Sequence, residues 1–159
     1  MAVTQALVER FKPIVYVPKE TDDAKIIEVL YEIFENYAVL WYHWPYDDYE
    51  NREDYEPIIL VFRNDLLVRI GTRPHKKYRK YNSWNAEEGR PIIVFTTSFH
   101  GPSIPGPKFV DSLIGFFATH SSDMLADYGL EQGHPPEWFI KDGTKIEVYS
   151  YANSIADIA

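Results

Sequence analysis

Two apolar runs on either side of a two-residue turn limit the folds open to this chain more than any other feature. The runs are residues 57–63 (PIILVFR) and 66–71 (LLVRIG), and the pair Asn64-Asp65 stands between them. Two β-rich runs joined by two turn-forming residues predict a β-hairpin. The aromatic run at residues 38–44 (AVLWYHW) predicts one more strand just before it. The middle of the chain is therefore expected to form an antiparallel sheet.

The flanking segments predict further strands and several helices. Thr4 is placed to cap a short helix that ends before Pro13. Apolar residues recur at helical spacing in the next segment, which predicts a helix that Thr21 or Asp22 caps and that ends near Tyr37. A second long helix is expected at residues 109–128, and further strands are expected at 13–17, 91–97 and 145–151.

The order of these elements predicts an antiparallel-rich α+β fold or β-sandwich. Several strands join through hairpins, which a doubly wound parallel sheet does not allow. The chain has 159 residues and no internal repeat or long linker, so we expect one domain over residues 1–159. The glycines of residues 101–107 (GPSIPGP) alternate with prolines that lack the N–H groups of a phosphate-binding loop.

Composition and charge exclude several classes of function. The formal net charge is -8, which argues against nucleic-acid binding. The chain has no cysteine, so neither disulfides nor thiol chemistry are expected. No apolar window is long enough for a transmembrane segment, and residues 1–15 do not resemble a secretion signal. These features predict a soluble, cytoplasmic protein.

One short stretch contains an unusual number of acidic residues. Its six carboxylates are those of Asp47, Asp48, Glu50, Glu53, Asp54 and Glu56. If Asp54 and Glu56 enter a strand, both side chains point to the same face. Together with an aspartate at 47 or 48 and the amide oxygen of Asn51, they offer the oxygen ligands that Ca²⁺, Mg²⁺ and Mn²⁺ prefer. The alternative is a solvated acidic loop.

A basic run and two histidines offer a second set of candidate residues. The run at residues 73–81 (RPHKKYRKY) is suited to an anion such as phosphate, with Tyr78 placed to stack on a sugar. His75 and His100 follow predicted strands, where site residues often collect and where a histidine can move protons. The alternatives are a solvated basic face and exposed histidines. His43, inside the aromatic run, is expected to be a hydrogen-bonded core residue.

The order of these segments resembles the NLP family, the necrosis- and ethylene-inducing-peptide-like proteins. Residues 50–56 (ENREDYE) stand in the place of the family's heptapeptide G-H-R-H-D-W-E, and residues 45–47 (PYD) stand where the family has P-K-D. Three further segments follow in the family's order. These are residues 11–13, like its F-K-P, residues 67–78, like its L-V-G-V-S-A-S-A-H-G-x-Y strand, and residues 90–100, like its H-P strand that ends in a loop histidine.

This resemblance implies a β-sandwich with flanking helices and a divalent-cation site. Asp47, Asp54 and Glu56 would be metal ligands, and Asn51 stands in the place of a metal-proximal histidine. His75 and His100 match histidines near the family's site, and the family acts by cytolysis after binding sphingolipid sugar headgroups.

The chain also departs from the family. Both heptapeptide histidines are replaced, by Asn51 and Glu53, and the family's cysteines are absent. These departures predict a distant intracellular relative that keeps the scaffold.

The predicted function is cation-assisted binding of a small polar ligand, such as a sugar, a polyol or a phosphate-bearing headgroup. The residues expected to complete the pocket are Arg73, His75, Lys76, Tyr78 and His100. One alternative is a structural or interaction domain with a degenerate site. The least favoured alternative is a metal-dependent hydrolase in which His75 or His100 moves protons. The sequence predicts neither the ligand nor the oligomeric state.

Overall fold

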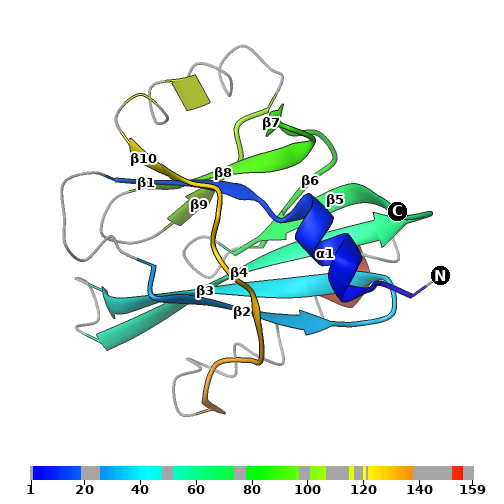
Figure 1. Ribbon diagram of the computed structural model, residues 1–159, viewed down its shortest axis with the longest axis horizontal. Helices are drawn as coiled ribbons and strands as arrows, with labels where there is room; N and C mark the ends of the chain where they lie inside the picture. Colours follow the sequence, from blue (N-terminus) through cyan, green and yellow to red (C-terminus); the bar gives the residue numbers. More distant parts are fainter. Residues whose placement is uncertain are drawn as a thin grey trace.

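Two β-sheets face each other across an apolar core, as the computed structural model shows (Figure 1). The structure describes residues 2–18, 26–47, 52–73, 78–96, 101–106, 115–116, 120, 122–137 and 152–155. The expected fold class, an α+β fold with a central antiparallel-rich β-sandwich and flanking helices, is confirmed. Within the described residues, no helix is long and apolar enough to cross a membrane.

The larger sheet has six strands in the order β11-β2-β3-β4-β5-β6. Their bounds are Glu131–Gln132 (β11), Glu28–Ile33 (β2), Tyr37–Asp47 (β3), Arg52–Arg63 (β4), Leu66–Thr72 (β5) and Arg79–Tyr81 (β6). All neighbours in this sheet are antiparallel except β11 and β2, which pair in parallel. The long strands β3 and β4 form its centre.

The smaller sheet has the strand order β10-β1-β8-β7, and β9 also pairs with β8. Its strands are Ser122–Leu125 (β10), Ile14–Pro18 (β1), Arg90–Thr96 (β8), Ala86–Glu87 (β7) and Gly101–Ser103 (β9). β1 and β8 pair in parallel, whereas β10 pairs with β1 in the antiparallel sense. Two segments far apart in the sequence therefore flank β1.

The predicted hairpin between β4 and β5 is confirmed. Asn64 and Asp65 have φ values of 52° and 60°, so both turn residues adopt the left-handed conformation. Two consecutive positive φ values are typical of the type I′ turn, whose twist matches that of the flanking strands.

The predicted N-terminal helix is also confirmed as α1 (Gln5–Phe11). The Thr4 hydroxyl accepts a hydrogen bond from the Leu7 amide at 3.2 Å, which satisfies one free donor of the first turn. The Val3 amide donates to the Glu35 carbonyl in the β2–β3 turn. α1 therefore packs near the start of β3, at the end of the sandwich opposite to the end of that strand (Figure 1).

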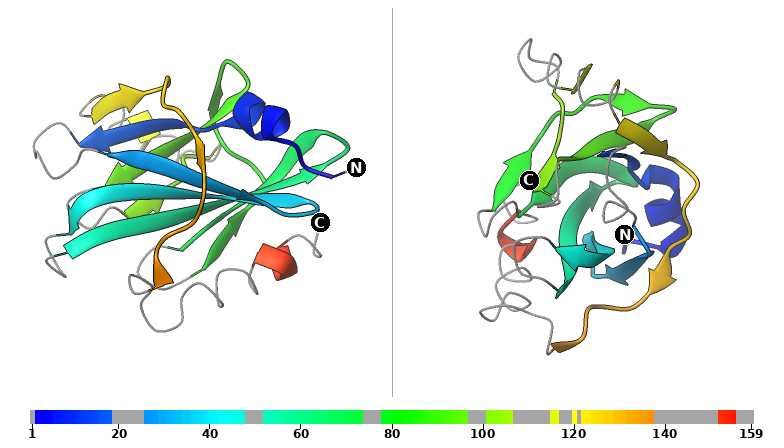
Figure 2. Two further views of the ribbon diagram at one scale, coloured as in Figure 1. Left: turned by 60° about the horizontal axis from the view of Figure 1, so that its bottom comes forward. Right: turned by 90° about the vertical axis from the view of Figure 1, so that its left-hand side faces the viewer.

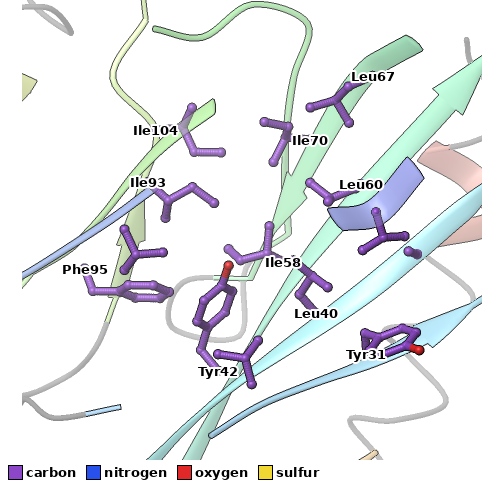
Figure 3. Close-up of a cluster of buried hydrophobic side chains, with 14 of the residues drawn as sticks. Tyr31, Leu40, Tyr42, Ile58, Leu60, Leu67, Ile70, Ile93, Phe95 and Ile104 are labelled. Carbon is purple, nitrogen blue, oxygen red and sulfur yellow. The ribbon is translucent and has the colours of Figure 1, made fainter. Parts of the chain in front are cut away.

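Side chains from both sheets meet in the core. Figure 3 shows Tyr42 and Ile58 of the larger sheet pointing toward Ile93 and Phe95 of the smaller sheet. Phe95 lies 5.2 Å from the Tyr42 ring centroid and 4.7 Å from that of Trp44. The end of β8 therefore packs against the second half of β3, which contains Tyr42 and Trp44.

The predicted helix between Thr21 and Tyr37 is wrong where the structure describes the segment. Residues 28–33 form β2, which pairs with β3 from Glu28↔His43 to Ile33↔Ala38. Tyr31 of β2 belongs to the core between the sheets, whereas Leu30 packs against the opposite face. Because both faces of β2 are covered, apolar residues occur at neighbouring positions and imitate helical spacing.

The predicted helix at residues 109–128 is wrong in its last part. Ser122–Leu125 forms β10, and Leu125 pairs with Val15 of β1. Residues 115–116 and 120 are helical, and the rest of 107–121 lies outside the described residues. The predicted strand at 145–151 also lies outside them.

The crossing segment, residues 126–130, connects the two sheets along one side of the sandwich (Figure 1). The Tyr128 hydroxyl donates to the Pro13 carbonyl and hydrogen-bonds to the Tyr42 hydroxyl at 2.8 Å. Arg90 donates to the Ala126 carbonyl at 2.7 Å. The crossing segment is thus tied to both sheets.

A short helical turn at residues 152–155 covers the outer face of the larger sheet, the face away from the smaller sheet (Figure 2). Ile155 packs in a cluster with Ile59 and Val61. The buried Arg69 guanidinium donates to the Ile155 carbonyl at 2.8 Å. An apolar cluster therefore covers part of this face as well.

Candidate functional site

Asp54 and Glu56 lie on β4 and face the inside of the sandwich. Asp54 is opposite Trp44 and Glu56 is opposite Tyr42, and both aromatic residues belong to the core between the sheets. Residues directly opposite each other in a β-ladder project to the same side. The expectation that the two carboxylates share one strand face is confirmed. Asp54 is 3% exposed, and Glu56 is half-buried.

The surroundings of Asp54 are mainly aromatic. Trp44 is fully buried opposite it, and the Phe95 ring packs edge-on against Trp44. A carboxylate in such surroundings loses most of its hydration, so it requires a cation or hydrogen-bond donors. The same low polarity strengthens its attraction for a cation.

The β3–β4 ladder becomes irregular just beyond these residues. It is regular up to Trp44↔Asp54, and then the register shifts before the pair Asp47↔Arg52. Asn51 lies outside the described residues, and of Asp47 only the backbone is described. Of the four predicted metal ligands, the structure therefore places the side chains of Asp54 and Glu56. Among the described side chains, no group of three or more His, Asp or Glu could hold a metal ion.

One polar residue that the sequence analysis did not single out, Thr72, shares this inner face. Thr72 is opposite Ile58 on one side and opposite Arg79 on the other, one row from Glu56. Thr72 is fully buried, and its hydroxyl has no hydrogen-bond partner among the described residues. The strict alternation from Ile70 to Thr72 was the signal that could have placed it on the core face.

Arg73 and Tyr78 are brought together, but on the other side of the sheet. The Arg73 guanidinium carbon lies 5.4 Å from the Tyr78 ring centroid. Tyr78 packs against the apolar cluster on the outer face, together with Tyr55. Of the other residues predicted to bind a ligand, His75, Lys76 and His100 lie outside the described residues.

A cluster of polar and aromatic residues occupies the outer face directly behind the two carboxylates. We call it the outer-face cluster; its members are Glu28 of β2, His43 of β3, and Glu53 and Tyr55 of β4. His43 Nδ1 lies 2.6 Å from Glu28 Oε2, and His43 Nε2 lies 3.5 Å from Glu53 Oε1. The imidazole stacks on the Tyr55 ring with 4.0 Å between centroids.

Burial and the two neighbouring carboxylates raise the pKa of Tyr55 to about 12. His43 is 4% exposed, which confirms the expectation of a hydrogen-bonded core histidine.

Comparisons with known proteins support the fold of the chain. No family model and no curated protein sequence matches the chain. A solved structure of NLPPya in complex with glucosamine is similar, with a TM-score of 0.50, 17% identity, and coverage of 81% of this chain and 72% of that one. Necrosis and Ethylene inducing Protein 2, from the causal agent of cocoa's witches' broom disease, is similar at a TM-score of 0.48 and 14% identity, covering 82% of this chain and 74% of that one.

The two sheets and their packing thus define a β-sandwich. More specifically, the chain has an NLP-like fold, as the sequence resemblance implied.

Proposed function

We propose that this protein binds a small hydroxylated ligand of the sugar class with the help of a divalent cation held by Asp54 and Glu56. The observation that carries the proposal is the placement of these two carboxylates on one strand face, pointing into an aromatic-lined end of the sandwich. The predicted ligands Asp47, at the end of β3, and Asn51, between β3 and β4, would complete the coordination.

The chemistry of the carboxylates favours a hard cation. Oxygen ligands select Ca²⁺, Mg²⁺ or Mn²⁺ over softer metals. A cation beside Asp54 would be attracted strongly, because this carboxylate is buried and water screens its charge little. The remaining coordination positions of such an ion are suited to the hydroxyl oxygens of a sugar or polyol, or to a phosphate oxygen.

The class of ligand is supported by a structural neighbour and by the local side chains. The similar structure of NLPPya contains glucosamine. In the present chain, the Thr72 hydroxyl lies on the same sheet face as Glu56, and Arg79 is directly opposite Thr72. Such a mixture of carboxylate, hydroxyl and guanidinium groups is typical of sites that bind polar ligands.

His75 and His100 remain candidate ligand-binding residues, because each follows closely in the sequence on a strand that ends near the carboxylates. β5 ends at Thr72, three residues before His75. Residues 97–100 connect Thr96 and Gly101, which are paired with each other. Thr96 directly follows Phe95, which contacts Trp44. Short connections therefore begin near Asp54 and contain both histidines. Lys76 stays a prediction for the same ligand. Arg73 and Tyr78 meet on the outer face, so they stay predictions without a place beside the two carboxylates.

Calorimetry of the metal-stripped protein tests the proposal. Ca²⁺, Mg²⁺ and Mn²⁺ are titrated into the wild-type protein, Asp54→Asn, Glu56→Gln and Asp65→Asn. Asp65 is an exposed carboxylate in the distant hairpin turn and serves as the matched control. Saturable binding that weakens in the first two variants and persists in Asp65→Asn is expected.

Glucosamine and glucose are then titrated with the preferred cation present. Binding of sugar that requires the cation would support the whole proposal. Absence of cation binding in the wild-type protein would contradict it and favour a scaffold that acts through protein partners. Chelator-sensitive turnover of ester or phosphodiester substrates would favour a hydrolase instead.

A further inference from the structure

We propose that His43 is a positioning residue that holds Asp54 and Glu56 in place from the opposite face of the sheet. Its role in cation affinity rests on the function proposed above, whereas its role in fixing β4 can be measured without any ligand. His43 does this through the outer-face cluster, which ties three neighbouring strands together at one point.

The contacts of His43 reach both neighbouring strands. Its Nδ1 is within 2.6 Å of Glu28 on β2, a distance typical of a charge-assisted hydrogen bond. Because a carboxylate only accepts, Nδ1 donates the proton. Its Nε2 lies 3.5 Å from Glu53 Oε1 of β4, an ion-pair distance, but makes no hydrogen bond among the described residues. The direct contact with β4 is therefore mainly the stacking of the ring on Tyr55, with an interplanar angle of 10°. The Ile27 amide also donates to the His43 carbonyl at 2.9 Å, so β2 is attached through main chain and side chain alike.

Because side chains alternate along a strand, residues held on the outer face fix the direction of their neighbours on the inner face. Glu53 and Tyr55 bracket Asp54 in the sequence, and Glu56 follows Tyr55 directly. With Glu53 and Tyr55 held on the outer face, Asp54 and Glu56 must project inward. A slip of one residue would move both carboxylates to the outer face.

The outer-face cluster lies next to the irregular end of the β3–β4 ladder, where contacts that fix the register of β4 are expected to have the largest effect. The β3–β4 register is regular up to Trp44↔Asp54 and shifts before Asp47↔Arg52. β5 does not extend to this point, because its last residue, Thr72, pairs with Ile58. The first residues of β4 are therefore paired with β3 but have no paired β5 residue on their other side. The contacts of His43 from β3 are thus expected to matter more for their position than they would in the middle of the sheet.

Three variants separate positioning from general stability. His43→Phe keeps an aromatic ring that can stack on Tyr55 but removes both polar contacts. His43→Gln restores a donor that can reach Glu28. The control is Glu32→Gln, because Glu32 is also a β2 carboxylate that accepts a hydrogen bond from a β3 ring, that of Trp41 at 3.3 Å, but lies farther along the strand from Asp54.

The first measurement is amide hydrogen exchange in the metal-free protein, at a temperature where each variant is folded. In His43→Phe, exchange across residues 53–56 is expected to rise by about tenfold, because the ring loses the hydrogen bond to Glu28 that fixes its position against Tyr55, together with its ion-pair contact with Glu53. Exchange across residues 59–62 should change much less. His43→Gln should restore part of the protection, and Glu32→Gln should leave residues 53–56 unchanged.

The second measurement is the Kd of the preferred cation, which should also rise by about tenfold in His43→Phe and stay unchanged in Glu32→Gln. Unchanged exchange at residues 53–56 in His43→Phe would overturn the inference, as would an unchanged Kd. If the wild-type protein binds no cation, the proposed function fails and the exchange rates alone decide the inference. If His43→Phe does not fold, Glu53→Gln removes one contact and should shift exchange in the same direction by a smaller factor.

Discussion

Asp54 lies directly opposite Trp44 across the β3–β4 ladder, and both side chains point into the sandwich. This pairing makes Trp44 a natural reporter of the proposed cation site. Addition of the preferred cation should change the tryptophan emission of the wild-type protein. In Trp44→Phe the change should largely disappear, because the indole that neighbours the site is removed, while calorimetry should still detect the cation. An emission change of full size in Trp44→Phe would place the cation away from Asp54.

The buried tyrosine pair predicts a loss of stability at alkaline pH. Burial raises the pKa of Tyr42 and raises the pKa of Tyr128 well above the usual value. Above about pH 10 the unfolded chain loses these protons while the folded protein keeps them, so the unfolded state binds fewer protons. The free energy of unfolding should therefore hold below pH 10 and fall above it, by about 1.4 kcal/mol per pH unit for each tyrosine.

Urea unfolding at pH 9 and pH 11 measures this effect, with Tyr42→Phe as the comparison. The variant retains the hydrogen bond from Tyr128 to the Pro13 carbonyl but has one titrating group fewer. Its stability should fall less steeply between the two pH values. An identical slope in the variant and the wild-type protein would show that Tyr42 does not contribute.

Gly71 is required because Ile155 packs against its backbone. A Cβ at Gly71 would lie 2.7 Å from Ile155 Cδ1 and 3.3 Å from Ile59 Cβ. Ile155 has little room to move, since its carbonyl accepts from Arg69 and its side chain is 1% exposed. Gly71→Ala should therefore lower the free energy of unfolding by roughly 1–3 kcal/mol. Gly129→Ala, where a Cβ would meet nothing within 4 Å, should change it little, and equal effects in urea unfolding would contradict the explanation.

The β4–β5 turn can be improved at Asp65. Its φ of 60° is one that glycine adopts without steric cost, and Asn-Gly is the preferred pair of a type I′ turn. Asp65→Gly is expected to raise the free energy of unfolding by a few tenths to about 1 kcal/mol. Asp65→Val should lower it, because a β-branched residue is strained at positive φ. Denaturant titrations that rank Val above Gly would show that the turn does not limit stability.

Local signals were sufficient for several parts of the fold. Thr4 caps α1 through a hydrogen bond to an amide three residues away. Asn64 and Asp65 adopt the turn conformation that the adjoining apolar runs predict. The shared face of Asp54 and Glu56 follows from the two-residue period of a strand. Each of these features depends on interactions between residues close in the sequence.

Other features depended on partners far along the chain. Residues 28–33 and 122–125 become strands because β3 and β1 offer them edges to pair with, and their own spacing does not distinguish strand from helix. The resemblance to the NLP family indicated the sandwich, but the pairing of β10 with β1 could not be read from either segment. The roles of Thr72 and His43 likewise depend on which strands lie beside them.

The sequence by itself determined where the chain turns, which carboxylates share a face and that the protein is rich in β-structure. Only the tertiary structure decided that this face is the inner one, with Trp44 across from Asp54, and that Glu28, His43 and Glu53 gather behind it. The physical reason is the range of the interactions. Turn conformation and strand alternation are fixed within a few residues, whereas sheet order, burial and the meeting of distant side chains are fixed by how whole strands pair and pack.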